Sequence, residues 1–195
     1  MQEWQKPNAE HLSDEKAPGN REDRSAVAGL YEWVGAAIFS LTLVALVFAF
    51  LFRIVGVVGS SMVPTLHEGD RLIVTRLFYQ PKQGDIVIIN MHDEEPLVKR
   101  IIAVGGDRLR MDGEGGVYVN GEKLNEPYTQ GITYPLGFGT EEQVVPEDCV
   151  FVMGDNREHS KDSRSTADVG FVKQSDIMGQ AVLRIFPLTQ AQVLH

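Results

Sequence analysis

Residues 97–104 read Leu-Val-Lys-Arg-Ile-Ile-Ala-Val, an apolar run rich in β-branched side chains and interrupted by two adjacent basic residues. Because the side chains of a strand alternate between its two faces, Lys99 is expected on the same face as Leu97 and Ile101. Such a lysine has two interpretations. It is either an edge-strand lysine that prevents aggregation, or a desolvated lysine whose lowered pKa leaves a neutral amine able to act as a base.

Short runs of the same kind recur on both sides of this segment, with turn residues between them. Asn120-Gly121 directly follows one such run and is typical of a type I′ hairpin, because both residues tolerate a positive φ. The sequence shows no amphipathic helix of convincing length after residue 56, so we predict a mostly β domain with antiparallel strands over 56–195. The other runs are 71–76, 85–90, 117–119, 149–153 and 181–186.

A longer apolar run without charges, residues 34–52, lies upstream. Its length matches the ~20 residues that a helix needs to cross a hydrocarbon core of ~30 Å. A cleaved signal peptide has a shorter core that follows a short basic segment, and a buried soluble helix would normally show a polar face. We therefore predict a transmembrane anchor over 31–55, preceded by a flexible polar tail over 1–30. The basic residues on its two sides narrowly favour a cytoplasmic N-terminus.

The composition restricts the class of protein. The chain has 195 residues, of which 43% are hydrophobic and 23% charged, as expected for a folded protein of modest size. A net charge of -9 argues against nucleic acid as a partner, because phosphate binding needs clustered Lys and Arg. Cys149 is the only cysteine and is expected to be a buried thiol. The histidines show no metal-ligand spacing, so we expect neither a metal nor a cofactor.

Two further segments hold side chains that could carry chemistry. Residues 59–66 read Gly-Ser-Ser-Met-Val-Pro-Thr-Leu. A serine hydroxyl there needs a neighbouring base to become a nucleophile, and without one the segment is an ordinary loop. Residues 153–164 are dense in Gly, Arg and short polar side chains. They form either a solvated loop or a set of hydrogen bonds and ion pairs that holds a site together.

Taken in chain order, these segments resemble the conserved motifs of the type I signal peptidases. The resemblance covers roughly residues 30–187, and the short length and single anchor are similar to the compact Gram-positive form of that family. The matching stretches are 61–66, Gly84-Asp85-Ile86-Val87, 99–107, Gly154-Asp155-Asn156-Arg157, Ser160, Asp162-Ser163-Arg164 and Gly170-Phe171-Val172.

This resemblance implies a barrel-like antiparallel β catalytic domain outside the cytoplasm, held in the plasma membrane by one transmembrane helix. The implied activity is that of a serine endopeptidase that removes signal peptides from exported preproteins after a small-x-small motif. Ser61 is the implied nucleophile, Lys99 the general base that later serves as the acid, and Ser160 a hydroxyl that orients the lysine amine. Ion pairs and hydrogen bonds that brace the site are implied for Asp155, Arg100, Asp162 and Arg164.

The resemblance leaves one part of the site open. The Ser61 backbone N–H is expected to contribute to an oxyanion hole. Some members place a serine donor two residues before the nucleophile, where this chain and the compact Gram-positive forms have Gly59. Ser60 lies between Gly59 and Ser61, so the sequence does not decide which group is the second oxyanion donor. The matching positions imply that Leu66 and Val98 line the substrate pockets, and the substrate is expected to bind as an added strand.

Two other classes of protein compete with this interpretation. A self-cleaving repressor-type protease also uses a Ser-Lys pair, but it carries a DNA-binding region where this chain has residues 34–52. A catalytically dead, membrane-anchored β domain that only binds secreted chains would not need to keep both Ser61 and Lys99. The sequence indicates neither the oligomeric state nor the preferred preproteins.

Overall fold

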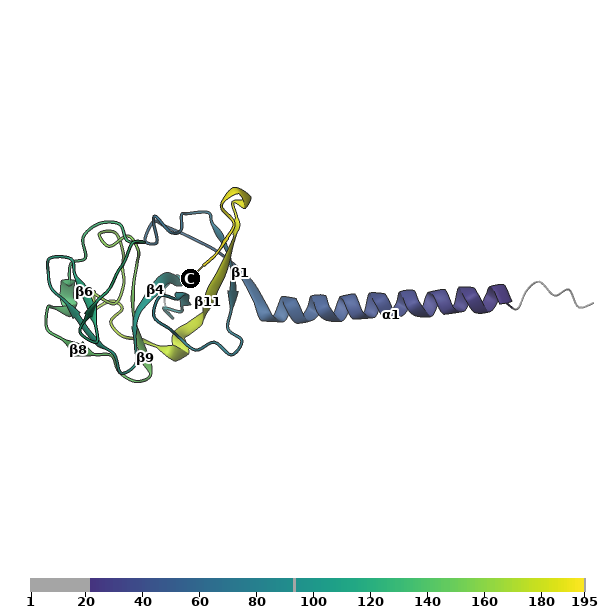
Figure 1. Cartoon of the computed structure of the whole chain (residues 1–195), viewed down its shortest axis with the longest axis horizontal. Helices are drawn as coiled ribbons and strands as arrows, with labels where there is room; N and C mark the ends of the chain where they lie inside the picture. The colour runs from purple at the N-terminus through teal and green to yellow at the C-terminus, as the bar shows by residue number, and fades with distance from the viewer. Residues whose placement is uncertain (1–21, 93, 195) are drawn as a thin grey trace, which may run out of the picture. The chain divides into compact units, whose positions relative to one another are not determined.

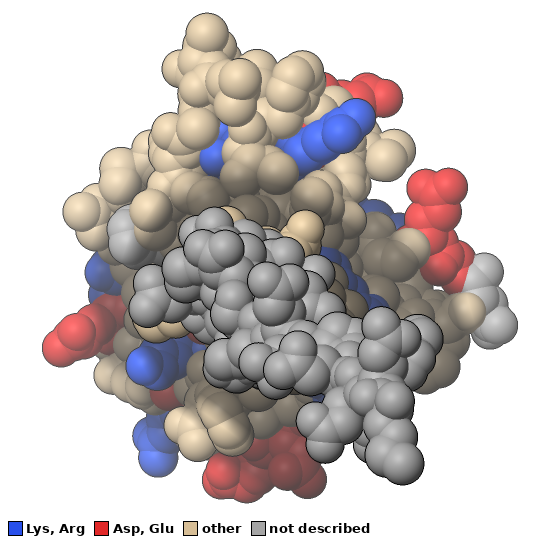
Figure 2. All heavy atoms as spheres, turned by 90° about the vertical axis from the view of Figure 1, so that its right-hand side faces the viewer, with Lys and Arg blue, Asp and Glu red and all other residues tan. Residues whose placement is uncertain are grey.

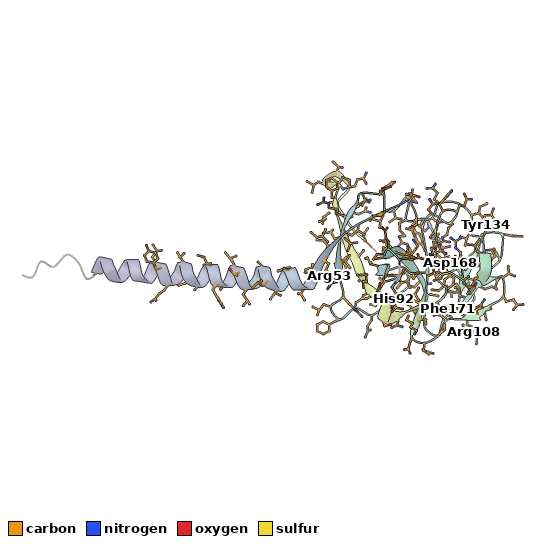
Figure 3. The ribbon with its side chains drawn as sticks, turned by 180° about the vertical axis from the view of Figure 1, so that it is seen from behind. Arg53, His92, Arg108, Tyr134, Asp168 and Phe171 are labelled. Atoms are coloured by element: carbon orange, nitrogen blue, oxygen red, sulfur yellow. The ribbon has the colours of Figure 1, made fainter. Side chains whose placement is uncertain are left out.

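The computed structural model describes residues 22–92 and 94–194, and the chain divides into two compact units, Met1–Val47 and Phe48–His195. The described residues of the first unit lie in the helix α1 (Glu22–Leu51). Within it, Gly29–Ala49 has a mean hydropathy of 1.9 and no buried residue, so α1 is long and apolar enough to cross a membrane. Figure 3 shows side chains projecting outward along most of this helix. A helix without a polar face is what the sequence predicted for an anchor.

The helix α1 and the predicted anchor over 31–55 differ at both ends. Residues 1–21 of the predicted tail lie outside the described residues, but residues 22–30 are already helical. At the other end, α1 stops at Leu51, and β1 (Phe52–Gly56) pairs with β2 (Arg71–Thr75). The predicted anchor included residues 52–55, which read Phe-Arg-Ile-Val. Their backbone groups are instead hydrogen-bonded to a strand almost twenty residues later, and Arg53 is exposed at this junction (Figure 3).

The second unit consists of two antiparallel sheets (Figure 1). The larger sheet has the order β1-β2-β11-β3-β4-β9-β10, with β12 paired to β11, and the smaller has the order β7-β6-β5-β8. The predicted class, mostly β with antiparallel strands, is confirmed. The remaining strands of the larger sheet are β3 (Ile86–Ile89), β4 (Leu97–Val104), β9 (Cys149–Met153), β10 (Val172–Lys173), β11 (Ile177–Phe186) and β12 (Gln192–Val193).

The smaller sheet confirms the predicted hairpin. Asn120 and Gly121 connect β6 to β7 with φ values of 54° and 85°, as a type I′ turn requires. Three short 3₁₀ helices complete the described part of this unit: η1 (Leu136–Phe138), η2 (Gln174–Asp176) and η3 (Leu188–Gln190). The strands of this sheet are β5 (Arg108–Met111), β6 (Val117–Val119), β7 (Glu122–Lys123) and β8 (Gln143–Val144).

Buried apolar side chains form three clusters around the central strands. One cluster includes Met62, Leu66 and Leu72, and therefore ties the segment that holds Ser61 to the sheet. Leu66 is fully buried, which contributes about 1.5–3 kcal/mol relative to an exposed leucine. Cys149, expected to be buried, is partly buried and packs against another cluster. On the face seen in Figure 2, Lys and Arg side chains lie among Asp and Glu side chains.

Candidate active site

Lys99 lies in the interior of the larger sheet. Its strand β4 is paired on one side with β3, where Lys99 is opposite Val87, and on the other side with β9. The side chain is almost completely buried, with 2% of its surface exposed. An edge-strand lysine would be exposed along an unpaired edge. The structure therefore excludes the edge-strand interpretation and supports the desolvated one.

The Lys99 amine meets the Ser61 hydroxyl. The Nζ atom lies 2.7 Å from Ser61 Oγ and also donates to the backbone carbonyl of Val98, at 3.1 Å. Burial lowers the pKa of Lys99 from 10.5 to about 8, and the negative charges of Asp162 and Asp155 limit this fall. A neutral amine within hydrogen-bond distance of a hydroxyl is the arrangement that nucleophilic catalysis by serine requires.

Buried anchors hold Ser61 at this position. Met62 and Leu66, on its C-terminal side, are buried in the same apolar cluster, and the Leu66 N–H donates to the Met62 carbonyl at 2.8 Å. On the N-terminal side, Gly59 has a φ of 79°, a left-handed conformation that favours glycine. Gly59 and Ser60 are exposed, and Ser61 is half-buried. Val98 packs against the cluster that contains Leu66, so the two expected pocket residues lie in one apolar region.

The ion pair between Arg100 and Asp155 lies next to this pair of residues. The guanidinium donates to both carboxylate oxygens, from Nε at 2.9 Å and from a terminal nitrogen at 2.8 Å, and both side chains are buried. Arg100 also donates to the Gly84 carbonyl at 2.8 Å, and its guanidinium lies 4.0 Å from the ring centre of Tyr128. Thr65 Oγ1 donates to Asp155 as well. The pair thus connects β4 to the segment of Ser61 and to the loop after β9.

A second buried ion pair fixes the rest of that loop. Arg164 donates to both oxygens of Asp162 at 2.9 Å, and Asp162 also accepts the Gly154 N–H at 3.0 Å. The same terminal nitrogen of Arg164 that donates to Asp162 also donates to the Arg157 carbonyl, at 2.7 Å. All of the residues expected to brace the site are therefore brought together. Their interactions satisfy the polar groups that burial would otherwise leave unpaired.

Ser160 lies beside the site without a bond to Lys99. Within residues 22–92 and 94–194, its buried Oγ has no hydrogen-bond partner. A side-chain carbon at Gly154 would overlap both Ser160 Oγ and the Ser61 carbonyl oxygen, so Gly154 lies directly against both serines. The orienting role that the resemblance implies for Ser160 stays a prediction.

The sequence interpretation missed several contacts. Thr65, Asn156 and Tyr128 received no role, although the first two lie inside the quoted motifs. Tyr128 lies in a loop that gives no periodic signal, and its ring is brought to Arg100 by the fold. Thr65 and Asn156 could have been predicted to form supporting hydrogen bonds, because short polar side chains commonly bond to backbone groups nearby.

The fold and this site describe a β-rich protein in which a buried lysine contacts a half-buried serine, and comparisons with known proteins show its family. The family model described as "Signal peptidase, peptidase S26" matches residues 30–186. Signal peptidase I of Bacillus licheniformis is 39% identical over 175 residues, which cover 83% of this chain and 91% of that protein. Signal peptidase I T of Bacillus subtilis strain 168 is 34% identical over 193 residues, covering 92% and 97%.

A crystal structure of a signal peptidase I from Enterococcus faecalis is 27% identical, with a TM-score of 0.43, and its match covers 52% of this chain and 97% of that one. The family match extends over most of the chain, from α1 to the end of β11. The chain belongs to the signal peptidase family, peptidase S26, and is a protease of that family.

Proposed function

We propose that this protein removes signal peptides from exported preproteins by a Ser61–Lys99 mechanism. The observation that carries the proposal is the 2.7 Å contact between Lys99 Nζ and Ser61 Oγ in a buried setting. Ser61 Oγ attacks the scissile carbonyl while Lys99 takes its proton. The same proton then passes to the leaving amine as the peptide C–N bond breaks. A water molecule, deprotonated by Lys99, attacks the acyl group on Ser61, and the proton returns to Ser61 Oγ as the signal peptide leaves.

Three groups around the pair support this chemistry. The Ser61 N–H is available to the developing oxyanion, and Ser160 is proposed to orient the lysine amine from beside Gly154. Leu66 and Val98 lie in the apolar region next to Ser61 and are proposed to line shallow pockets for small side chains. Such pockets fit the small-x-small pattern that precedes signal-peptide cleavage sites.

The membrane arrangement follows from the proposed substrate. Exported preproteins reach the outer surface of the membrane, so the β-rich unit is proposed to lie outside the cytoplasm and the N-terminus inside. α1 is proposed as a single-pass anchor in the plasma membrane, because Gly29–Ala49 is uncharged apart from Glu32 and long enough to span it. The anchor would keep the site at the bilayer surface, where the cleavage site of a preprotein emerges.

The proposal is tested by incubating the full-length protein, purified in detergent micelles, with a preprotein whose signal peptide ends in Ala-x-Ala. We expect one cut after the second alanine, measured by mass spectrometry of both products. The matched control preprotein carries aspartate in place of that alanine, and its cleavage should fall by at least about 100-fold, since a charge cannot enter a shallow apolar pocket unpaired. Equal cleavage of the two preproteins would contradict the proposed specificity.

The pH dependence of cleavage should report the lowered pKa of Lys99. The free enzyme is active only when the amine is neutral, so kcat/KM should rise with pH and reach half of its maximum near pH 8. Asp162 raises the pKa of Lys99, so Asp162→Asn should move this midpoint to lower pH. Exposed Asp168, in Asp168→Asn, serves as the control and should leave the midpoint in place. A midpoint near 10.5 in the wild type would show that Lys99 is not desolvated in solution.

A further inference from the structure

We propose that Asn156 is a positioning residue that aims the Ser61 N–H at the oxyanion, an inference that rests on the function proposed above. Asn156 is buried, with 6% of its surface exposed, and its main chain and side chain contact the two peptide groups that flank the Ser61 Cα. Its Nδ2 donates to the Ser60 carbonyl at 3.2 Å, and its backbone N–H donates to the Ser61 carbonyl at 3.0 Å.

The bond from Asn156 Nδ2 to the Ser60 carbonyl controls the direction of the Ser61 N–H. The Ser60 carbonyl and the Ser61 N–H belong to one planar trans peptide group, so they point in opposite directions. When Asn156 holds the carbonyl on its own side, the N–H is turned to the other side. Among the described residues, no backbone carbonyl accepts a hydrogen bond from the Ser61 N–H. The donor is therefore free for a substrate oxygen, and its direction is fixed by what holds the carbonyl.

The Ser60 carbonyl also accepts a second hydrogen bond. That bond alone would constrain the Ser60–Ser61 peptide group less. The Val63 N–H donates to it at 3.2 Å from within the same turn. Asn156 adds a donor from a different part of the chain, so the peptide cannot rotate with the turn. Two donors on the carbonyl also polarise the amide and strengthen its N–H as a donor.

Asn156 is itself held on the side away from Ser61. It forms a parallel bridge with Gln130, whose N–H donates to the Asp155 carbonyl and whose carbonyl accepts the Arg157 N–H, both at 2.8 Å. Arg157 in turn is paired with Glu126 through buried side chains. The asparagine is thus supported by the segment 126–130, and the support is preorganised before any substrate binds.

The decisive variants are Asn156→Ala and Asn156→Leu, studied in the full-length protein in detergent micelles. Both remove the side-chain donor, keep the backbone bond to the Ser61 carbonyl and add no charge near Lys99; leucine also keeps the branched shape. Losing an oxyanion donor outright costs about 10²–10³ in kcat, so a misaimed donor should lower kcat about tenfold or more. KM and the pH midpoint should not change. Asn125→Ala, at an exposed asparagine, is the control.

A peptide aldehyde ending in Ala-x-Ala gives a second measurement. Ser61 Oγ adds to its carbonyl carbon while the oxygen, taking the π electrons, occupies the oxyanion position and Lys99 takes the proton. Affinity for the aldehyde should fall by the same factor as kcat/KM, whereas affinity for the matching peptide alcohol, which forms no adduct, should stay the same. A role that is only structural would weaken both ligands or raise KM.

The outcomes separate the inference from the function on which it rests. Cleavage of the preprotein by the wild type decides the proposed function, and the ratio of each variant to the wild type decides the role of Asn156. A kcat within twofold of the wild type in a folded variant, or a shifted pH midpoint, would overturn the inference. If one variant fails to fold, as judged by circular dichroism, the other carries the test, together with the aldehyde-induced shift of the Ser61 amide resonance in the wild type.

Discussion

Replacing Ser61 by alanine is expected to lower kcat for preprotein cleavage by about 10⁴-fold or more, and Lys99→Met by a similar factor. Alanine removes the attacking oxygen, and methionine keeps the length and apolar character of lysine while removing the base. Because the two groups act in a single step across the 2.7 Å contact, the double variant should be no slower than either single variant. Cleavage is measured by single-turnover kinetics of a preprotein in detergent micelles.

The controls use the same chemical changes away from the site. Ser175 and Lys173 are exposed, so Ser175→Ala and Lys173→Met should cleave at the wild-type rate. A Ser61→Ala variant that keeps more than a tenth of the wild-type kcat would place the nucleophile elsewhere. Additive losses in the double variant would show that Lys99 assists cleavage without acting on Ser61.

The sequence singled out six of the twelve strands that the structure describes, but it did not predict where the helix ends. Each apolar run that it singled out after residue 56 overlaps a strand. The predicted anchor extended to residue 55, whereas Phe52–Gly56, apolar apart from Arg53, form β1. An apolar run of a few residues fits a helix and a strand equally well, and only pairing with a distant segment decides between them. Here that segment is β2, which no local pattern links to β1.

The candidate site shows the same division between local and long-range information. The order of the motifs predicted that Ser61 and Lys99 would meet, and the structure brings them into contact. The burial of Lys99 could not be predicted without the sheet. Only the position of β4 between β3 and β9 distinguishes a buried lysine from one at an edge. Contacts such as Thr65 to Asp155 join residues 90 positions apart, and neither residue type predicts the other.

Among the interactions that support the site, the buried ion pair between Arg100 and Asp155 should cost the most folding free energy to break. Asp155→Ala removes the carboxylate that accepts two hydrogen bonds from the buried Arg100 guanidinium, and removing one partner of a buried ion pair costs about 3–5 kcal/mol of folding free energy. Two other contacts of Arg100, its bond to the Gly84 carbonyl and its stacking on Tyr128, bring no negative charge to the guanidinium. The measurement is denaturant unfolding of the full-length protein in micelles, followed by the β-sheet signal in circular dichroism.

Two comparisons show whether the loss comes from removing one charged partner of a buried pair. Glu94→Ala breaks the exposed pair of Glu94 with Lys161, in which water replaces the lost partner, and should leave the unfolding midpoint almost unchanged. The double variant Arg100→Met/Asp155→Leu removes both charges and fills the space with apolar groups, so it should regain much of the stability lost in Asp155→Ala. If the double variant is less stable than Asp155→Ala, the geometry of the pair, not the cost of removing one charged partner, holds the loop after β9 against β4. Its catalytic activity should stay low even when stability returns, because Asp155 also holds Thr65 in the segment that carries Ser61.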